Sequence, residues 1–202
     1  MDVDAVEIRV LGCLIEKQRT TPDQYPLSLN ALRLACNQTT NREPVVDYDE
    51  RTIKAALDRL SHREWTRFAS SASSRALKYR HLLDERLSLS ARELSLLAVL
   101  MLRGPQTLGE LKQRTERMHR FESLAEVAET VEGLSRREFV ARLERRPGQK
   151  EDRYAQLLGG ETPAHEIVEE PTSDGTDRLA GIEARLERLE TAFEQLSARL
   201  DR

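Results

Sequence analysis

The hydrophobic positions in the first third of the chain recur at intervals of three and four residues, which is the period of an amphipathic helix. This pattern predicts three helices, over residues 4–18, 28–36 and 49–64. Two prolines separate the first helix from the second, and the polar run at residues 37–43 separates the second from the third. Ser28, and either Asp47 or Asp49, have side chains suited to cap the second and third helices.

After the third helix the pattern changes to short, alternating segments. Residues 65–69 and 76–83 are predicted strands, joined by the small polar turn SSASSR. The next part of the chain predicts helices near residues 90–102, 107–118 and 123–137. Two further strands, near residues 139–145 and 152–158, flank the turn at Pro147 and Gly148. Three helices and a hairpin are therefore expected twice.

An internal repeat supports this duplication. Residues 60–65 read LSHREW, and residues 134–139 read LSRREF. Three helices followed by a β-hairpin, in about 75 residues, are typical of a winged helix-turn-helix. The predicted fold is mainly α, of the α+β type. It has tandem winged helices at residues 1–83 and 84–158, followed by a coiled-coil-like helix.

The tail has two parts of different composition. Residues 159–177 hold six acidic and no basic residues, which predicts a flexible linker. Residues 178–202 carry an unbroken heptad seam, which predicts self-association. Docking of this helix on its own chain stays open as the alternative. The seam residues are Leu179, Ile182, Leu186, Leu189, Phe193, Leu196 and Leu200.

The net charge of −3 conceals an uneven distribution. Residues 1–83 sum to +2, residues 84–158 to +1, and residues 159–202 to −6, so the body is slightly basic. Only 4% of the residues are aromatic, which favours helices over a β-sandwich. No apolar run approaches the ~20 residues needed to span a bilayer, and the acidic start lacks the basic region of a secretion signal. A cytoplasmic location without membrane contact is expected.

Residues 11–50 carry a long and specific motif, LGCLIEKQRTTPDQYPLSLNALRLACNQTTNREPVVDYDE. This segment closely resembles the YceH-like family of bacterial proteins, and the resemblance extends to about residue 158. The resemblance implies tandem winged helices. It implies no accepted activity, catalytic residue or cofactor.

In a helix-turn-helix the third helix enters the major groove, and the wing contacts phosphate. The first copy has basic residues at the expected positions of this surface. For each of these residues, the alternative is that it is an ordinary solvent-exposed charge with no role in binding. Asn and Gln in residues 37–43 could read adenine edges, although capping of turns and helices is the favoured role. The candidate DNA-binding residues are Arg42, Arg51, Lys54, Arg75, Lys78 and Arg80.

The third helix of the second copy is unsuited to DNA, because residues 121–134 contain four glutamates and no basic residue. The second copy is therefore expected to bind a protein partner, or to contact double-stranded DNA only through its wing. The leading hypothesis is a DNA-associated protein and candidate transcriptional regulator, in which the first copy reads the DNA. The alternative is a protein-interaction adaptor without direct DNA binding.

No catalytic motif is apparent. The four histidines lack the spacing of metal ligands, and there is no glycine-rich phosphate loop. Cys13 and Cys36 fit small core residues better than nucleophiles or a disulfide. We therefore expect a protein that is not an enzyme and that needs no cofactor or metal.

Overall fold

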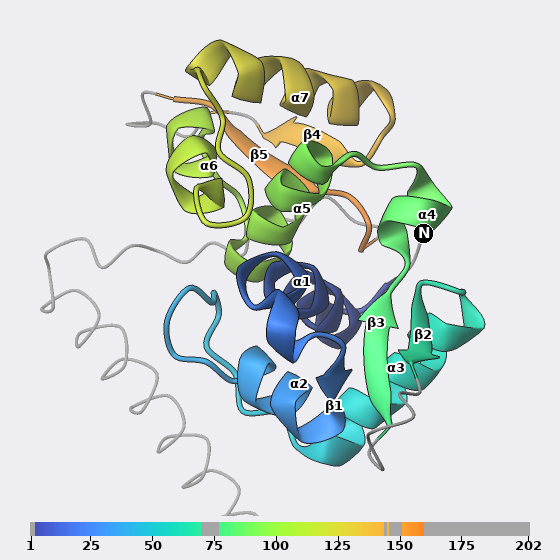
Figure 1. Ribbon diagram of the computed structural model, residues 1–202. Helices are drawn as coiled ribbons and strands as arrows, with labels where there is room; N and C mark the ends of the chain where they lie inside the picture. Colours follow the sequence, from blue (N-terminus) through green and yellow to red (C-terminus); the bar gives the residue numbers. More distant parts are fainter. Residues whose placement is uncertain (1–2, 70–76, 144, 146–150, 160–202) are drawn as a thin grey trace, which may run out of the picture. The chain divides into compact units, whose positions relative to one another are not determined.

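The computed structural model describes residues 3–69, 77–143, 145 and 151–159 (Figure 1). These residues contain seven α-helices and two small antiparallel sheets, so the fold is α+β and mostly helical. They all belong to one compact unit. No helix in this part of the chain is both long and apolar enough to cross a membrane.

The first half contains the three expected helices, α1 (Ala5–Thr20), α2 (Leu29–Cys36) and α3 (Glu50–His62). Each begins where a side chain caps its N-terminus. The caps are Asp4, Ser28 and Asp49, and their oxygen atoms accept the N–H groups of Glu7, Ala31 and Thr52. A single 3-10 turn (Pro22–Gln24) and the short strand β1 (Leu27–Ser28) connect α1 to α2.

The hairpin of the first half is formed by β2 (Thr66–Ala69) and β3 (Lys78–His81), and β1 joins it, so the order is β1-β3-β2. Sequence reasoning missed β1, which has only two residues. It also extended the second strand too far, because the structure begins helix α4 (Leu83–Leu87) at Leu83. The strand pairing ends with the hydrogen bond from the Leu82 N–H to the Trp65 carbonyl. The Leu82 carbonyl accepts the N–H of Arg86, and this bond begins helix α4.

The second half follows the same order, with α5 (Ala91–Arg103), α6 (Leu108–Thr115) and α7 (Leu124–Arg136) before β4 (Val140–Leu143) and β5 (Arg153–Gln156). Helix α6 was expected to reach residue 118. It ends earlier because the N–H groups of Met118 and His119 both donate to the Thr115 carbonyl, which turns the backbone.

The two halves agree in backbone detail. Leu27 pairs with Tyr79 beside the start of α2, and Gln106 makes the equivalent bridge to Tyr154 beside the start of α6. Glu64 and Glu138, each at the turn into a hairpin, have positive φ values of 59° and 58°. The sequence repeat therefore corresponds to a structural equivalence that reaches individual hydrogen bonds.

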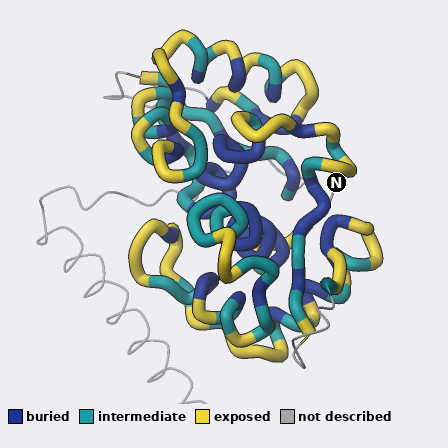
Figure 2. Tube along the Cα trace, in the orientation of Figure 1, coloured by how far each residue is buried: buried dark blue, intermediate teal, exposed yellow. Residues whose placement is uncertain are grey.

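Helices α1 and α5 pack against each other at the centre of the described residues (Figure 2). Every residue of α1 from Ile8 to Ile15, and every residue of α5 from Leu94 to Leu102, is buried. Gly12 lies at the contact. A Cβ atom there would come within 2.9 Å of Leu102 Cγ and 3.0 Å of Met101 Cβ. The two helices can approach this closely only because Gly12 lacks a side chain.

The close packing of α1 and α5 gives both halves one shared hydrophobic core. The boundary expected between residues 83 and 84 therefore separates two repeats, and it does not separate two independently packed cores. This is a correction to the picture of two compact modules, each with a core of its own.

Several expectations concern residues outside the described ranges. They include the turns at residues 70–75 and 147–148, the linker beyond Gly159, and the seam from Leu179 to Leu200. Self-association through the tail stays a prediction.

The Gly12 contact gives a direct test of the packing. Gly12→Ala should lower the free energy of unfolding by about 1–3 kcal/mol, because the added methyl group overpacks the α1–α5 contact. Gly133→Ala is the matched control, since a Cβ atom at this position of α7 meets nothing within 4 Å. The control should raise stability by up to about 1 kcal/mol through helix propensity. Denaturant unfolding of both variants measures the difference, and a gain from Gly12→Ala would contradict the packing.

Candidate functional site

The solvent-facing side of the hairpin β2–β3 is basic. It carries Arg67, Lys78 and Arg80, which we call the cationic hairpin face. Arg67 lies directly opposite Arg80 in the strand register, an arrangement of like charges that is unfavourable without a counter-charge. Glu85 Oε1 lies 3.1 Å from Arg80 Nη2 and offsets one charge. Within the described residues, Arg67 and Lys78 have no ion-pair partner.

The opposite side of the hairpin fixes it to α1. The imidazole of His81 is buried, and its Nε2 lies 2.7 Å from Gln18 Oε1. The backbone N–H of His81 donates to the Tyr25 hydroxyl at 2.8 Å, so Tyr25 holds its own loop against the body. Burial lowers the pKa of His81 to about 4, so the imidazole is neutral at pH 7. The cationic hairpin face is therefore backed by a buried, neutral imidazole, with the Asp84 carboxylate 3.7 Å from its Nδ1.

The outer face of α3 is mixed in charge. Arg51 is exposed at its N-terminal end, whereas Lys54 forms an ion pair with Asp58 one turn later. Asp49 and Glu50 lie at the same end of the helix. Lys54 lies close enough to the hairpin for its charge to oppose the rise that burial causes in the pKa of Tyr79. Among the described residues, Arg51 of α3 has no ion pair.

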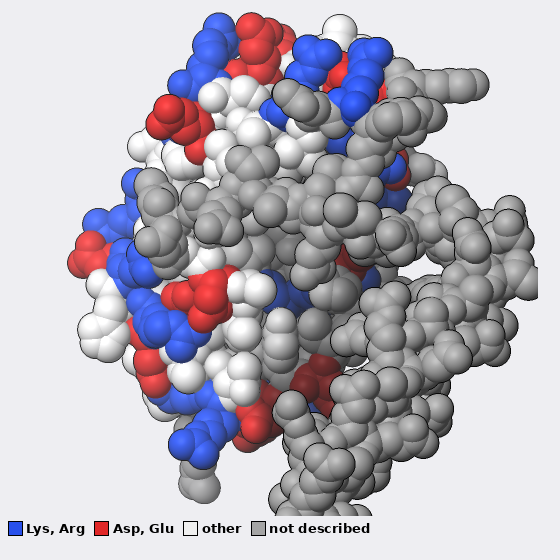
Figure 3. Space-filling model, turned by 180° about the vertical axis from the view of Figure 1, so that it is seen from behind, with Lys and Arg blue, Asp and Glu red and all other residues white. Residues whose placement is uncertain are grey.

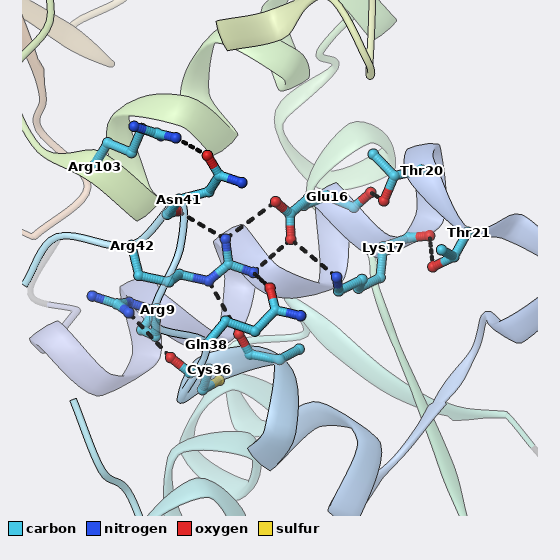
Figure 4. A network of polar contacts seen from close by, with 11 residues as sticks. Arg9, Glu16, Lys17, Thr20, Thr21, Cys36, Gln38, Asn41, Arg42 and Arg103 are labelled. Carbon is cyan, nitrogen blue, oxygen red and sulfur yellow. Dashed lines mark hydrogen bonds and ion pairs between the residues drawn. The ribbon is translucent and has the colours of Figure 1, made fainter. Parts of the chain in front are cut away.

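Arg42 has an interior role instead. Its side chain is fully buried, and its five N–H groups reach five acceptors (Figure 4). The guanidinium binds the Glu16 carboxylate through two bonds, of 2.6 and 3.1 Å. The remaining bonds go to the Ala35 and Asn41 carbonyls and to Gln38 Oε1. Arg42 therefore has no donor left for phosphate, and we leave it out of the DNA-contacting set.

This network braces the polar run at residues 37–43. Burial favours the neutral form of Arg42, but hydrogen bonds and charge from Glu16 outweigh it and raise the pKa of the guanidinium. The Asn37 side chain bonds to the backbone of Tyr48, accepting its N–H at 2.9 Å and donating to its carbonyl at 2.8 Å. Asn37 therefore holds the loop through a bond to a residue eleven positions later, which differs from the local capping favoured from the sequence. The Glu43 N–H donates to the Leu102 carbonyl, which attaches the loop to α5.

The second half differs in its electrostatics. Glu122, Glu129 and Glu132 are exposed on or beside α7, and they make no ion pair among the described residues. The hairpin β4–β5 does contain arginines, and Arg142 and Arg145 share the single carboxylate of Asp152, which offsets one of their two charges. Hydrogen bonds from Arg145 hold the pKa of Asp152 below its usual value. Among the described residues, the hairpin of the first half has two cations without an ion pair, Arg67 and Lys78, whereas Arg142 and Arg145 of the second hairpin both contact a carboxylate.

Arg67 was missed by sequence reasoning, although its position opposite Arg80 in the predicted hairpin could have shown it. Arg75 lies outside the described residues. Figure 3 shows Lys and Arg side chains interspersed with Asp and Glu on the face seen from behind, without a large patch of one sign among the described atoms. On this face, contact with a polyanion would therefore involve few charges.

Comparison with known proteins places the chain among bacterial relatives. A family model described as "Protein of unknown function, DUF480" matches residues 3–149. A "UPF0502 protein" of Solibacter usitatus is 47% identical over 198 residues, which cover 96% of this chain and 95% of that protein. A "UPF0502 protein" of Serratia proteamaculans is 44% identical over 211 residues, which cover 100% of this chain and 97% of that protein. None of these descriptions states an activity or carries the YceH-like name, which stays a prediction.

The Arg42 network predicts a strong dependence on Glu16. Glu16→Ala should lower the free energy of unfolding by about 3 kcal/mol, because it leaves a buried guanidinium without its counter-charge. Lys17→Ala is the control, since the Lys17 ammonium contacts the same carboxylate at 3.6 Å and is partly exposed. Its loss should cost less than about 1 kcal/mol. If both variants lower the free energy of unfolding by the same small amount, Glu16 does not hold Arg42.

Proposed function

We propose that this chain, which belongs to the DUF480 family of proteins of unknown function, is a non-catalytic DNA-associated protein. In this proposal each half is a winged helix, and the first half contacts the duplex. The observation that carries the proposal is the cationic hairpin face, where Arg67 and Lys78 lack counter-charges among the described residues.

The order of the elements supports the winged-helix interpretation. In each half three helices precede an antiparallel hairpin, and the residue before the second helix pairs with the hairpin's second strand. In winged helices the third helix and the hairpin face the duplex together. In this chain those elements are α3, with exposed Arg51, and the hairpin β2–β3.

The charges favour contact with the phosphate backbone over reading of bases. Duplex DNA carries one negative charge per ~1.7 Å of its axis, and two unpaired cations on a rigid hairpin would release condensed counterions. The N-terminal end of α3, which would enter the groove, carries Asp49 and Glu50 beside Arg51. We therefore propose binding that is weak in sequence preference and strongly dependent on salt.

The second half is the source of a second candidate function. The unpaired glutamates of α7 and the 49% exposed Leu124 next to them form a surface that suits a basic protein partner. An adaptor role would use this surface, with or without DNA contact by the first half. A chain that binds a basic protein partner but does not bind DNA would favour the adaptor role.

Charge reversal on the hairpin tests DNA contact. Fluorescence anisotropy of the full chain with a mixed-sequence 20-base-pair duplex should show binding that weakens between 50 and 200 mM KCl. Arg67→Glu with Lys78→Glu should weaken binding at 50 mM by about tenfold or more, because two phosphate contacts are lost and repulsion is added. The slope of log affinity against log salt should become shallower by about 1.8.

The control keeps the same change in net charge. Arg92→Glu with Arg136→Glu alters two exposed arginines of the second half that have no ion pair among the described residues. This variant should keep most of the affinity. Equal losses from both double variants, or no loss from the hairpin variant, would contradict duplex contact by the first half.

A further inference from the structure

A cleft of about 850 Å³ lies between the C-terminal part of α1, the loop at residues 37–41, and helices α5 and α6. In Figure 1 this loop and the hairpin β2–β3 lie on opposite sides of α1. The cleft is therefore distinct from the cationic hairpin face. Its volume falls within the range of about 300–1,000 Å³ that is usual for small-molecule sites.

The charged residues lining the cleft are mostly cations. Lys17, Arg103, Arg114 and Arg117 contribute four positive charges, and Glu16 contributes the one carboxylate. That carboxylate is already bound to the buried Arg42. Figure 4 shows Arg103 and Lys17 on either side of the Arg42–Glu16 pair.

The arginines of the cleft lack sufficient counter-charge. Arg103 donates to the neutral side chain of Asn41 and has no ion pair among the described residues, and neither has Arg117. Arg114 lies 3.4 Å from Glu110, but Arg153 shares the same carboxyl group at 3.5 Å. Burial and then the charges of Arg114 and Arg42 lower the pKa of Arg103. An anion between these guanidinium groups would relieve that repulsion.

The cleft also offers neutral surfaces for the rest of a ligand. Val99, Leu102 and Met118 provide apolar contacts, and Val99 and Leu102 are almost fully buried. The exposed Thr39 and Thr40 have no hydrogen-bond partner among the described residues, so their hydroxyl groups are free to donate or accept. Most of the lining is polar or charged, and the apolar part is limited to these three residues. A ligand that carries several charged groups and a small ring suits this composition.

We propose that this cleft binds a nucleotide-sized organic phosphate. Arg103 and Arg117 hold the phosphate groups, and the partly exposed Met118 contacts the ring. The loop at residues 37–41 closes one side, because Arg42 fixes it to α1. This assignment does not rest on DNA contact by the hairpin, since the two surfaces share no residue.

Isothermal titration calorimetry of the full chain with ATP tests the site. ATP should bind, and Arg103→Gln and Arg117→Gln should each weaken its binding at least fivefold. Arg117 is exposed, so its substitution leaves the fold unchanged. Arg136→Gln on α7 is the control and should bind ATP as the unaltered chain does. The hairpin variant Arg67→Glu with Lys78→Glu should also bind ATP unchanged, which separates this site from duplex contact.

Adenosine and pyrophosphate separate the contributions of the two ends of the ligand. Each should bind more weakly than ATP, because each uses half of the cleft. Absence of ATP binding at millimolar concentration would overturn the proposal. Equal affinity for pyrophosphate and ATP would overturn the assignment to an organic phosphate, and unchanged ATP binding by both arginine variants would overturn its location.

Discussion

The close contact between α1 and α5 at Gly12 is the constraint on which the remaining structure depends. Because the helices approach without an intervening side chain, both halves bury their apolar residues in one core. The same contact brings the loop at residues 37–43 beside α5, where Glu43 bonds to Leu102 and Asn41 to Arg103. The cleft exists because this loop, held by Arg42, lies next to the second half.

The spacing of the hydrophobic positions and the capping residues were sufficient to predict the order of helices and strands. Ser28 and Asp49 mark helix starts that the structure reproduces, because N-caps are local interactions. The shared core was missed, although residues 94–102, LSLLAVLML, are apolar on every face of a helix. Such a helix must be covered on all sides, which one small repeat cannot do. Strand β1 was missed because a strand of two residues is too short to show an alternation of apolar and polar positions.

The candidate site was predicted less well, because its decisive interactions join residues far apart in sequence. Arg42 lies in a polar run and resembles a solvated residue, but it binds Glu16, 26 positions earlier. Local pattern contains no sign of that pair. The contrast between the halves was visible in the glutamates of residues 121–134. The ion pairs of Arg142 and Arg145 with the shared carboxylate of Asp152, which add to that contrast, depend on the hairpin register.

One measurement tests the shared core most directly. Trp65, the only tryptophan, reports on the first half, and Phe139 occupies the equivalent position in the second half. Denaturant unfolding is followed by fluorescence in the unaltered chain and in a Trp65→Phe, Phe139→Trp variant, each beside its far-UV circular dichroism. A single cooperative core predicts that fluorescence and dichroism give coincident transitions in both proteins. Transitions that separate, with one half unfolding while the other stays folded, would contradict it.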